Sequence, residues 1–288
     1  MKDFLHPYAD LDVLARYAKI SPYLETFLGQ KEIASKIVGE DFVVLRRWTK
    51  DKPLYIQDFK AVDEDFLKLR AWHHLADVQK QLNEKQTTLR KYFVPRKLVN
   101  FFYAVNNEEG TKIDRIFIDI DRQDKTPQDA QKVAAELVKI IQKDKWLSAL
   151  ITYKLLTLRT GSSFHIYILL TKNISHAIYD KYFSYGDKKP DSFITKRADA
   201  ISESTGIAVN AGHARKKWVI ILDTSNTPPG KLGRVPFSLH IKDAKTIDGI
   251  CIPLETKELE EKSLISKLRW LTPEKVWQNI KKYSSLLT

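Results

Sequence analysis

Apolar residues along the chain follow two spacings, one typical of amphipathic helices and one typical of strands. Helical spacing runs through the first 40 residues, with an interruption at Ser21-Pro22, and it returns over residues 62–83. Thr126-Pro127 predicts another helix start, with threonine as the N-cap and proline in the first turn. We also expect a helix that ends at Gly206 and a helical tail from residue 255 onward.

Seven segments are rich in strand-forming residues and are bounded by turn formers. They cover residues 41–48, 99–105, 113–121, 149–158, 164–170, 218–222 and 249–254. No repeat of about 20 to 50 residues is visible, which argues against a solenoid or a propeller. Alternating strands and helices of this kind predict an α/β or α+β domain.

Composition narrows the class of protein. The chain has 288 residues, of which 43% are hydrophobic and 29% charged, as is typical of a globular protein. No segment approaches the roughly 20 apolar residues that span a bilayer, and the first residues lack an apolar signal core. Cys251 is the only cysteine, so the chain forms no intramolecular disulfide and no cysteine-based zinc cluster. We therefore expect an intracellular protein with no membrane partner.

The chain is basic, with 48 Lys and Arg against 36 Asp and Glu, which gives a net charge of +12 at pH 7. This surplus fits a polyanionic partner such as nucleic acid, but many soluble proteins are equally basic. Two basic clusters next to aromatic residues are candidate contacts to template phosphates, the alternative being a solvated basic surface. Their members are Arg46, Arg47, Arg215, Lys216 and Lys217.

The segment Arg115–Asp121 carries the clearest candidate chemistry. In a strand, Asp119 and Asp121 share one face with Phe117, while the isoleucines between them share the other. Two carboxylates about 7 Å apart along a strand repel each other and favour a divalent cation held by their oxygens. The alternative is that Asp121 only begins a turn and that Asp119 is exposed.

Two further strands carry polar groups at their ends. Ser163 and His165 would share one strand face just after a glycine turn, where a hydroxyl, a ring N–H and backbone amides suit phosphate oxygens. His165 could equally be a structural residue. Asp223 follows the apolar strand over residues 218–222, and by itself an aspartate there only begins a loop.

A fourth segment, residues 234–240, combines a cation, a hydroxyl and an imidazole in Arg234, Ser238 and His240, with Lys231 nearby. Such a set suits a triphosphate, and the alternative is a surface loop with a structural histidine. Three apolar strands that bring acids and a histidine to their ends are typical of two-metal phosphoryl transfer.

The order of these motifs, hh-D-h-D, S-x-H, h-h-L-D and R-x-P-F-S-L-H, resembles the catalytic small subunit of the archaeo-eukaryotic primase superfamily. Lys31–Ala34, Leu45–Trp48 and Asn100–Val105 resemble the stretches that precede the acidic motif in that family, so the resemblance covers residues from about 20 to 255. It implies an α+β catalytic core of mixed and antiparallel sheets flanked by helices, with an RRM-like half and a cleft active site. The implied core covers residues 1–254, divided near residue 110 into parts 1–110 and 111–254, and a helical tail covers residues 255–288.

The resemblance also implies an activity, DNA-template-dependent synthesis or extension of primers from NTPs or dNTPs with release of pyrophosphate. In that family, Asp119, Asp121 and Asp223 would hold two divalent cations, Mg²⁺ or Mn²⁺, and would be the catalytic residues. The residues that would contact the incoming nucleotide are Ser163, His165, Arg234, His240, Lys231, Ser238 and Arg159.

The chain departs from the family pattern in three ways. With one cysteine it cannot form the usual zinc site, and it lacks the cysteines of the large subunit's iron–sulfur cluster. The turn before the S-x-H motif, Thr160–Phe164, lacks the usual adjacent basic residues, and Arg159 would supply part of that charge.

The expected partners are a single-stranded DNA template and primer, nucleoside triphosphates, and a separate primase large subunit or a helicase. We expect a cytoplasmic, nucleoid-associated protein of an archaeon or an archaeal mobile element. Two other function classes stay open: a catalytically silent single-strand-binding replication factor with the same fold, and a metal-dependent nuclease.

Overall fold

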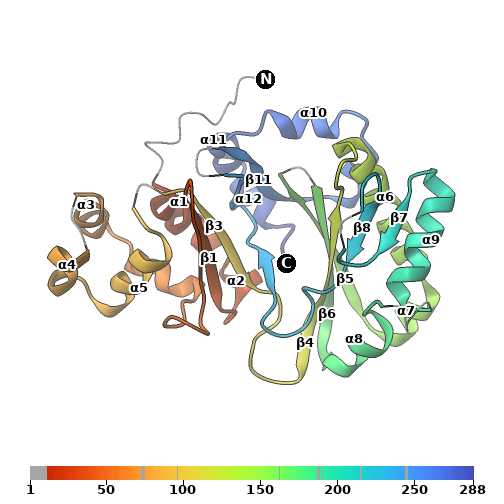
Figure 1. Ribbon diagram of the computed structural model, residues 1–288, viewed down its shortest axis with the longest axis horizontal. Helices are drawn as coiled ribbons and strands as arrows, with labels where there is room; N and C mark the ends of the chain where they lie inside the picture. Colours follow the sequence, from red (N-terminus) through yellow and green to blue (C-terminus); the bar gives the residue numbers. More distant parts are fainter. Residues whose placement is uncertain are drawn as a thin grey trace.

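Two β-sheets lie next to each other in the middle of the molecule, and helices cover their outer sides (Figure 1). The computed structural model describes residues 12–288 except 73–74, 96, 162, 187–188, 190, 215 and 244–245. The smaller sheet has four strands in the order β2-β1-β3-β9, with every neighbouring pair antiparallel. Its strands are β1 (Ile33–Val38), β2 (Val43–Arg46), β3 (Val99–Ala104) and β9 (Leu232–Arg234).

The helices of the N-terminal part pack around this smaller sheet. They are α1 (Val13–Ile20), α2 (Glu25–Leu28), α3 (Glu64–Trp72), α4 (Leu75–Val78) and α5 (Glu84–Tyr92), with 3₁₀ turns at Ser21–Tyr23, Ile56–Ala61 and Gln79–Gln81. Aromatic rings fill the space between helices and sheet: the Tyr17 ring lies 5.6 Å from Phe93 and 4.7 Å from Phe101. The Tyr17 hydroxyl donates to the Val99 carbonyl at 3.2 Å, so this buried phenol is not left unsatisfied.

The larger sheet has seven strands in the order β10-β11-β5-β6-β4-β8-β7. All neighbours are antiparallel except β7 and β8, which are parallel. The strands are β4 (Lys112–Asp121), β5 (Tyr153–Thr160), β6 (Ser163–Ser175), β7 (Val209–Ala211), β8 (Ile220–Asp223), β10 (Leu239–Ile241) and β11 (Ile247–Leu254).

Helices α6 to α9 cover the side of the larger sheet that lies away from the smaller one (Figure 1). Their bounds are α6 (Pro127–Lys143), α7 (Lys145–Leu150), α8 (His176–Tyr182) and α9 (Phe193–Thr205). Thr126 caps α6 in a capping box with Asp129, as the sequence predicts, and α9 ends at Gly206 with a left-handed φ of 69°. No helix in the described part of the chain is long and apolar enough to cross a membrane.

The C-terminal tail packs back on the body of the protein. It comprises a 3₁₀ turn at Thr256–Glu260 and helices α10 (Leu264–Arg269), α11 (Pro273–Gln278) and α12 (Ile280–Ser284). Gln131 of α6 donates to the carbonyls of Leu259 and Glu261, both at 2.8 Å. The tail therefore contributes to the same hydrophobic core.

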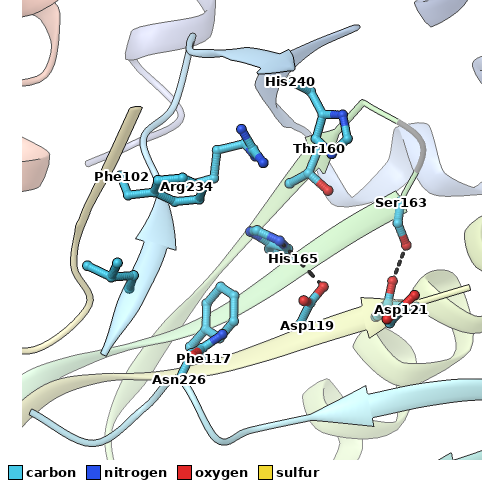
Figure 2. Close-up of a pocket in the computed structure, with 12 residues that line it drawn as sticks. Phe102, Phe117, Asp119, Asp121, Thr160, Ser163, His165, Asn226, Arg234 and His240 are labelled. Atoms are coloured by element: carbon cyan, nitrogen blue, oxygen red, sulfur yellow. Dashed lines mark hydrogen bonds and ion pairs between the residues drawn. The ribbon is translucent and has the colours of Figure 1, made fainter. Parts of the chain in front are cut away.

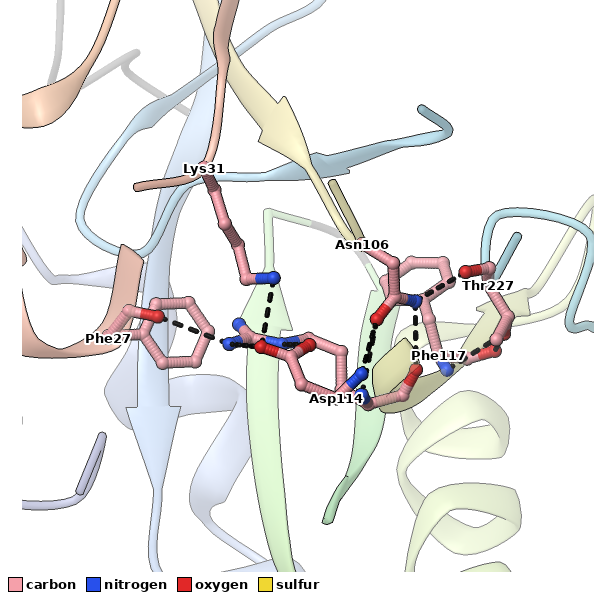
Figure 3. A network of polar contacts seen from close by, with 7 residues as sticks. Phe27, Lys31, Asn106, Asp114, Phe117 and Thr227 are labelled. Atoms are coloured by element: carbon pink, nitrogen blue, oxygen red, sulfur yellow. Dashed lines mark hydrogen bonds and ion pairs between the residues drawn. The ribbon is translucent and has the colours of Figure 1, made fainter. Parts of the chain in front are cut away.

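A polar network joins the two sheets where β3 ends (Figure 3). The Asn106 side chain is buried: its amide oxygen accepts from the N–H of Asp114 at 2.8 Å, and its amide nitrogen donates to the carbonyls of Arg115 and Thr227. The Thr227 hydroxyl in turn bonds both the N–H and the carbonyl of Phe117, at 3.0 and 3.1 Å. The network thus fixes β4 against the loop that follows β8.

Two sequence predictions need correction, and other elements were missed. Residues 33–38, counted within the helical first 40 residues, form β1 because their apolar side chains pair with β3 in an antiparallel register. Residues 149 and 150 end helix α7, which Asp144 caps, so β5 begins only at Tyr153. Helices α5 and α8 were not predicted from the spacing of apolar residues.

Candidate active site

A pocket of about 240 Å³ opens between the two sheets (Figure 2). Residues of the larger sheet form one wall, and the strands β3 and β9 of the smaller sheet contribute the other. The lining residues are Phe102, Phe117, Asp119, Ile120, Asp121, Thr160, Ser163, His165, Asn226, Leu232, Arg234 and His240. Six of them were predicted as site residues from the sequence: Asp119, Asp121, Ser163, His165, Arg234 and His240.

The acids lie on the pocket side of β4. Strand alternation turns Ile118 and Ile120 into the core and leaves Asp119 and Asp121 only partly buried. Asp223 on β8 is the direct cross-strand partner of Asp119, so their side chains share this face. The Asp121 carboxylate also accepts from the N–H of Gln123 at 3.2 Å, so this residue both lines the pocket and begins a turn.

Asp223 is more enclosed than the other two acids, with a side chain only 9% exposed. Its carboxylate accepts from the Tyr185 hydroxyl at 2.9 Å and from the Ser225 N–H at 2.7 Å, and it lies 2.6 Å from Nδ1 of His213. It does not line the pocket. Tyr185 and His213 were not predicted from the sequence, because neither belongs to a recognisable motif.

Burial, together with the carboxylates of Asp121 and Asp223, raises the pKa of Asp119 to about 7. Three carboxylates are hard oxygen ligands, and the repulsion that Asp119 experiences is what a bound divalent cation would remove, so these acids fit Mg²⁺ or Mn²⁺. Among the described residues, however, no three His, Cys, Asp or Glu side chains already converge as a metal site. The Asp223 carboxylate is turned towards His213 and Tyr185 instead.

His165 lies beside the acids, with Nε2 at 3.4 Å from the Asp119 carboxylate and its ring edge-on to Phe117 at 4.7 Å. Burial, with the charge of Arg234, holds the pKa of His165 well below its usual range, so the imidazole is neutral. Its Nδ1 is buried without a hydrogen-bond partner in the described structure. An unsatisfied polar atom next to a pocket marks a place where a ligand atom would be stabilised.

Arg234 and His240 form the opposite, basic side of the pocket. Asn100 and the Leu239 carbonyl hold Nη1 of Arg234, at 2.7 and 3.1 Å, and the guanidinium lies 4.9 Å over the Phe102 ring. Burial, Arg234 and Arg159 lower the pKa of His240 to about 3, so this ring is also neutral.

Gly161 allows His240 to approach the turn between β5 and β6. Its φ is 71°, and a Cβ atom built there would lie 2.6 Å from the His240 ring. A residue with a side chain would therefore displace the imidazole from the pocket.

The other four predicted nucleotide contacts either do not line the pocket or use their side chain in another hydrogen bond. The Ser163 hydroxyl lines the pocket but donates to the Ile120 carbonyl. Arg159, Ser238 and Lys231 do not line it. Arg159 is buried and donates to the Gly161 carbonyl at 2.6 Å. Ser238 is also buried, and its hydroxyl donates to the Val235 carbonyl at 2.6 Å. Lys231 is exposed.

Ser238 also fixes β11, because its carbonyl accepts from the N–H of Cys251 at 2.8 Å. The Cys251 carbonyl accepts in turn from the N–H of Phe237 at 2.6 Å, and its thiol is buried. This pairing supports the turn that carries Arg234 to His240.

The predicted nucleic-acid contacts lie in two separate places. Arg46 pairs with Asp51 at 3.3 Å, and Arg47 pairs with Glu108 at 3.4 Å. Lys216 and Lys217 are exposed in the connection between β7 and β8. Arg215 lies outside the described residues.

No protein-family model matches the chain, and no curated protein matches its sequence. Among solved structures, it is similar to the polymerase domain from Mycobacterium tuberculosis ligase D in complex with DNA. The TM-score is 0.56 at 14% identity, and the match covers 94% of this chain and 88% of that one. The chain therefore has the fold of a polymerase domain, which confirms the predicted α+β class.

Proposed function

We propose that the protein is a DNA-template-dependent nucleotidyltransferase, a primase or primase-polymerase that starts or extends primers from NTPs or dNTPs and releases pyrophosphate. The observation that carries the proposal is the composition of the pocket. Asp119 and Asp121 line one side with His165 next to them, while Arg234 and His240 line the other. Groups suited to cations and groups suited to phosphates meet in a single cavity, on a fold shared with a polymerase domain.

In this proposal Asp119, Asp121 and Asp223 hold two divalent cations, Mg²⁺ or Mn²⁺. Such ions, when bound, activate the attacking 3′-hydroxyl and neutralise the charge of the departing pyrophosphate. The raised pKa of Asp119 and the all-oxygen donor set support this assignment.

Arg234 and His240 form one wall of the pocket, called the basic wall below. This wall, together with His165, would hold the triphosphate. Arg234 is anchored through Nη1 to Asn100, which leaves other N–H donors of its guanidinium for phosphate oxygens. His165 and His240 are neutral and contribute ring N–H groups without adding charge. Phe102 and Phe117 line the same pocket and exclude water from part of it.

This wall also distinguishes the proposal from its alternatives. A nuclease that hydrolyses a phosphodiester needs the acids but no site for pyrophosphate. A silent single-strand-binding protein gains no stability from a carboxyl that burial and two like charges oppose.

The test is a template-directed assay on the purified chain, with Mg²⁺ or Mn²⁺, each nucleotide class in turn, and single-stranded DNA with or without a labelled primer. We expect template-dependent products from the wild type and none from the Asp119→Ala/Asp121→Ala variant. Asp124→Ala, an exposed acid on the turn after β4, is the matched control and retains activity. The proposal is wrong if the wild type makes no product, or if the double variant makes the same products.

A further inference from the structure

The connection between the parallel strands β7 and β8 is unusually short. β7 ends at Ala211 and β8 begins at Ile220, yet Val209 pairs with Ile220 and Ala211 with Leu222. Only eight residues connect the two strands, of which the structure describes 212–214 and 216–219. Parallel neighbours usually need a connection of about a dozen residues or more. The connection closes at Trp218, which has a left-handed φ of 62° that bulky residues rarely adopt.

This connection lies over the face of the sheet that carries the acids. Nδ1 of His213 is 2.6 Å from the Asp223 carboxylate at its beginning. Further along, Nζ of Lys216 lies 3.3 Å from the side-chain amide oxygen of Asn210, in the amide orientation that satisfies both ends of that group. Asn210 pairs with Ile221, which alternation places on the same face as Asp223.

Trp218 is presented to solvent at this position. Its side chain is 65% exposed, and no aromatic ring or cation contacts its indole among the described residues. Lys216 and Lys217 directly before it are exposed as well. An exposed indole is unfavourable for the free chain, and a partner that covers the ring removes this cost. The left-handed backbone at Trp218 is typical of residues that are held in place for a function.

We propose that Trp218 is a base-stacking platform for single-stranded nucleic acid, with Lys216 and Lys217 holding the phosphates beside the stacked base. Bases offer flat π-faces of any sequence, and a neighbouring cation pair matches the charge of the strand. Trp218 precedes Asp223 by five residues, so the two lie within about 18 Å of each other along an extended chain. The identification of this strand as template or primer rests on the proposed function, whereas the stacking contact itself does not.

The test compares Trp218→Ala, Trp218→Phe and the control Trp270→Ala, an indole that is 59% exposed on the C-terminal tail. Affinity for a fluorescein-labelled oligothymidine is measured by anisotropy at fixed ionic strength, without nucleotide or divalent cation. We expect Trp218→Ala to bind about 5- to 100-fold more weakly. Trp218→Phe should stay within about threefold of the wild type, and Trp270→Ala should be unchanged.

Cross-linking of the wild type makes the test independent of how the variants fold. An oligonucleotide with 5-iodouracil is irradiated in the complex, and the peptide that contains Trp218 is expected to carry the nucleotide. Equal affinity of Trp218→Ala and Trp270→Ala, or cross-links only at other peptides, would overturn the inference. Absence of primer extension by the wild type, together with an intact effect of Trp218 on oligonucleotide affinity, would count against the proposed function alone.

Discussion

Asp119 occupies an unfavourable position in the pocket, because burial and two neighbouring carboxylates oppose its charge. Its side chain is 33% exposed, yet it shares a face with Asp121 on its own strand and with Asp223 on the neighbouring strand. Residues that conflict with local stability in this way are typical of functional sites. The charge of Asp119 is thus unfavourable for folding but needed for the proposed catalysis. A single substitution at this position can separate the two effects.

Asp119→Asn should stabilise the fold while it abolishes primer synthesis. Because the neutral amide no longer repels two carboxylates, we expect the melting temperature in the presence of a chelator to rise by about 2 to 4 °C, equivalent to ~1 kcal/mol. Differential scanning calorimetry measures this change, and added Mn²⁺ should stabilise the wild type more than the variant. Asp124→Asn is the matched control, and an equal rise in that variant would contradict this explanation.

Lys31 is a source of pH-dependent stability outside the pocket. Its Nζ lies 2.9 Å from the Asp114 carboxylate, and burial, with the positive charge of Arg115, lowers its pKa to about 8 (Figure 3). Between this pKa and the ordinary value of 10.5 the unfolded chain binds more protons than the folded one, so the free energy of unfolding increases with pH in this window.

Lys31→Met removes this titration. Relative to the variant, the wild type should gain about 1 to 2 kcal/mol of unfolding free energy between about pH 7 and about pH 9.5. Urea unfolding of both proteins at several pH values measures the difference and cancels the contribution of other groups. A difference that does not change with pH would show that the lysine titrates as it does in the unfolded chain.

At the scale of elements, the strand β4 and the loop after β8 are held in place by side chains rather than by backbone pairing alone. Asn106 and Thr227 make this connection, and both are buried. β4 carries Asp119 into the pocket, and the loop after β8 carries Asn226. The hydrogen bonds of Asn106 and Thr227 therefore fix the positions of both pocket residues.

Asn106→Ala should therefore cost stability and order at the site. The substitution leaves buried backbone groups of Asp114, Arg115 and Thr227 without partners, and we expect a loss of about 2 to 4 kcal/mol in the free energy of unfolding. Asn107→Ala, an exposed neighbour, should cost less than about 0.5 kcal/mol. Chemical denaturation followed by circular dichroism measures the free energy of unfolding of both variants. Similar losses in the two would contradict the stabilising role given to the Asn106 hydrogen bonds.

Elements with strong local signals were predictable from the sequence. The cap at Thr126 and the alternation through β4 describe α6 and the acids correctly. β1 was not predicted, because a short apolar run fits a helix as well as a strand until its pairing with β3 decides between them.

The candidate site likewise contains residues that the sequence could place and residues that it could not. Residues on strands with clear alternation, such as His165 and Asp119, could be placed on a common face. The contacts of Asp223 with His213 and with Tyr185, which is 38 residues away, arise only from tertiary packing and leave no periodic pattern.

At the scale of the whole molecule, the chain crosses between the sheets three times, after β3, after β8 and again after β9. It leaves the smaller sheet after β3, builds most of the larger one, and returns at β9 to pair with β3 through Phe102 and Arg234. The pocket wall on the smaller sheet therefore combines Phe102 of β3 with Leu232 and Arg234 of β9.

The tail at residues 255–288 should be required for folding. It buries the hydrophobic side chains of Leu259, Leu264, Ile265, Val276, Ile280 and Leu287. At about 1.5 to 3 kcal/mol for each buried side chain, their loss would be as large as the whole stability of a typical domain, about 5 to 15 kcal/mol. A chain truncated after residue 254 should lose near-UV circular dichroism and bind a hydrophobic dye, and a cooperative melting transition in this truncated chain would contradict the expectation.

The reactivity of the single cysteine, Cys251, can report local opening of the structure next to the pocket. Cys251 is paired through its backbone with Phe237 and Ser238, next to the turn that carries Arg234, and burial raises the pKa of its thiol to about 12. An alkylating reagent can therefore modify the thiol only in molecules where β11 has separated from this turn. The rate of alkylation should report how often the basic wall opens, and slower labelling in the presence of nucleoside triphosphate would show that the nucleotide holds the two segments together.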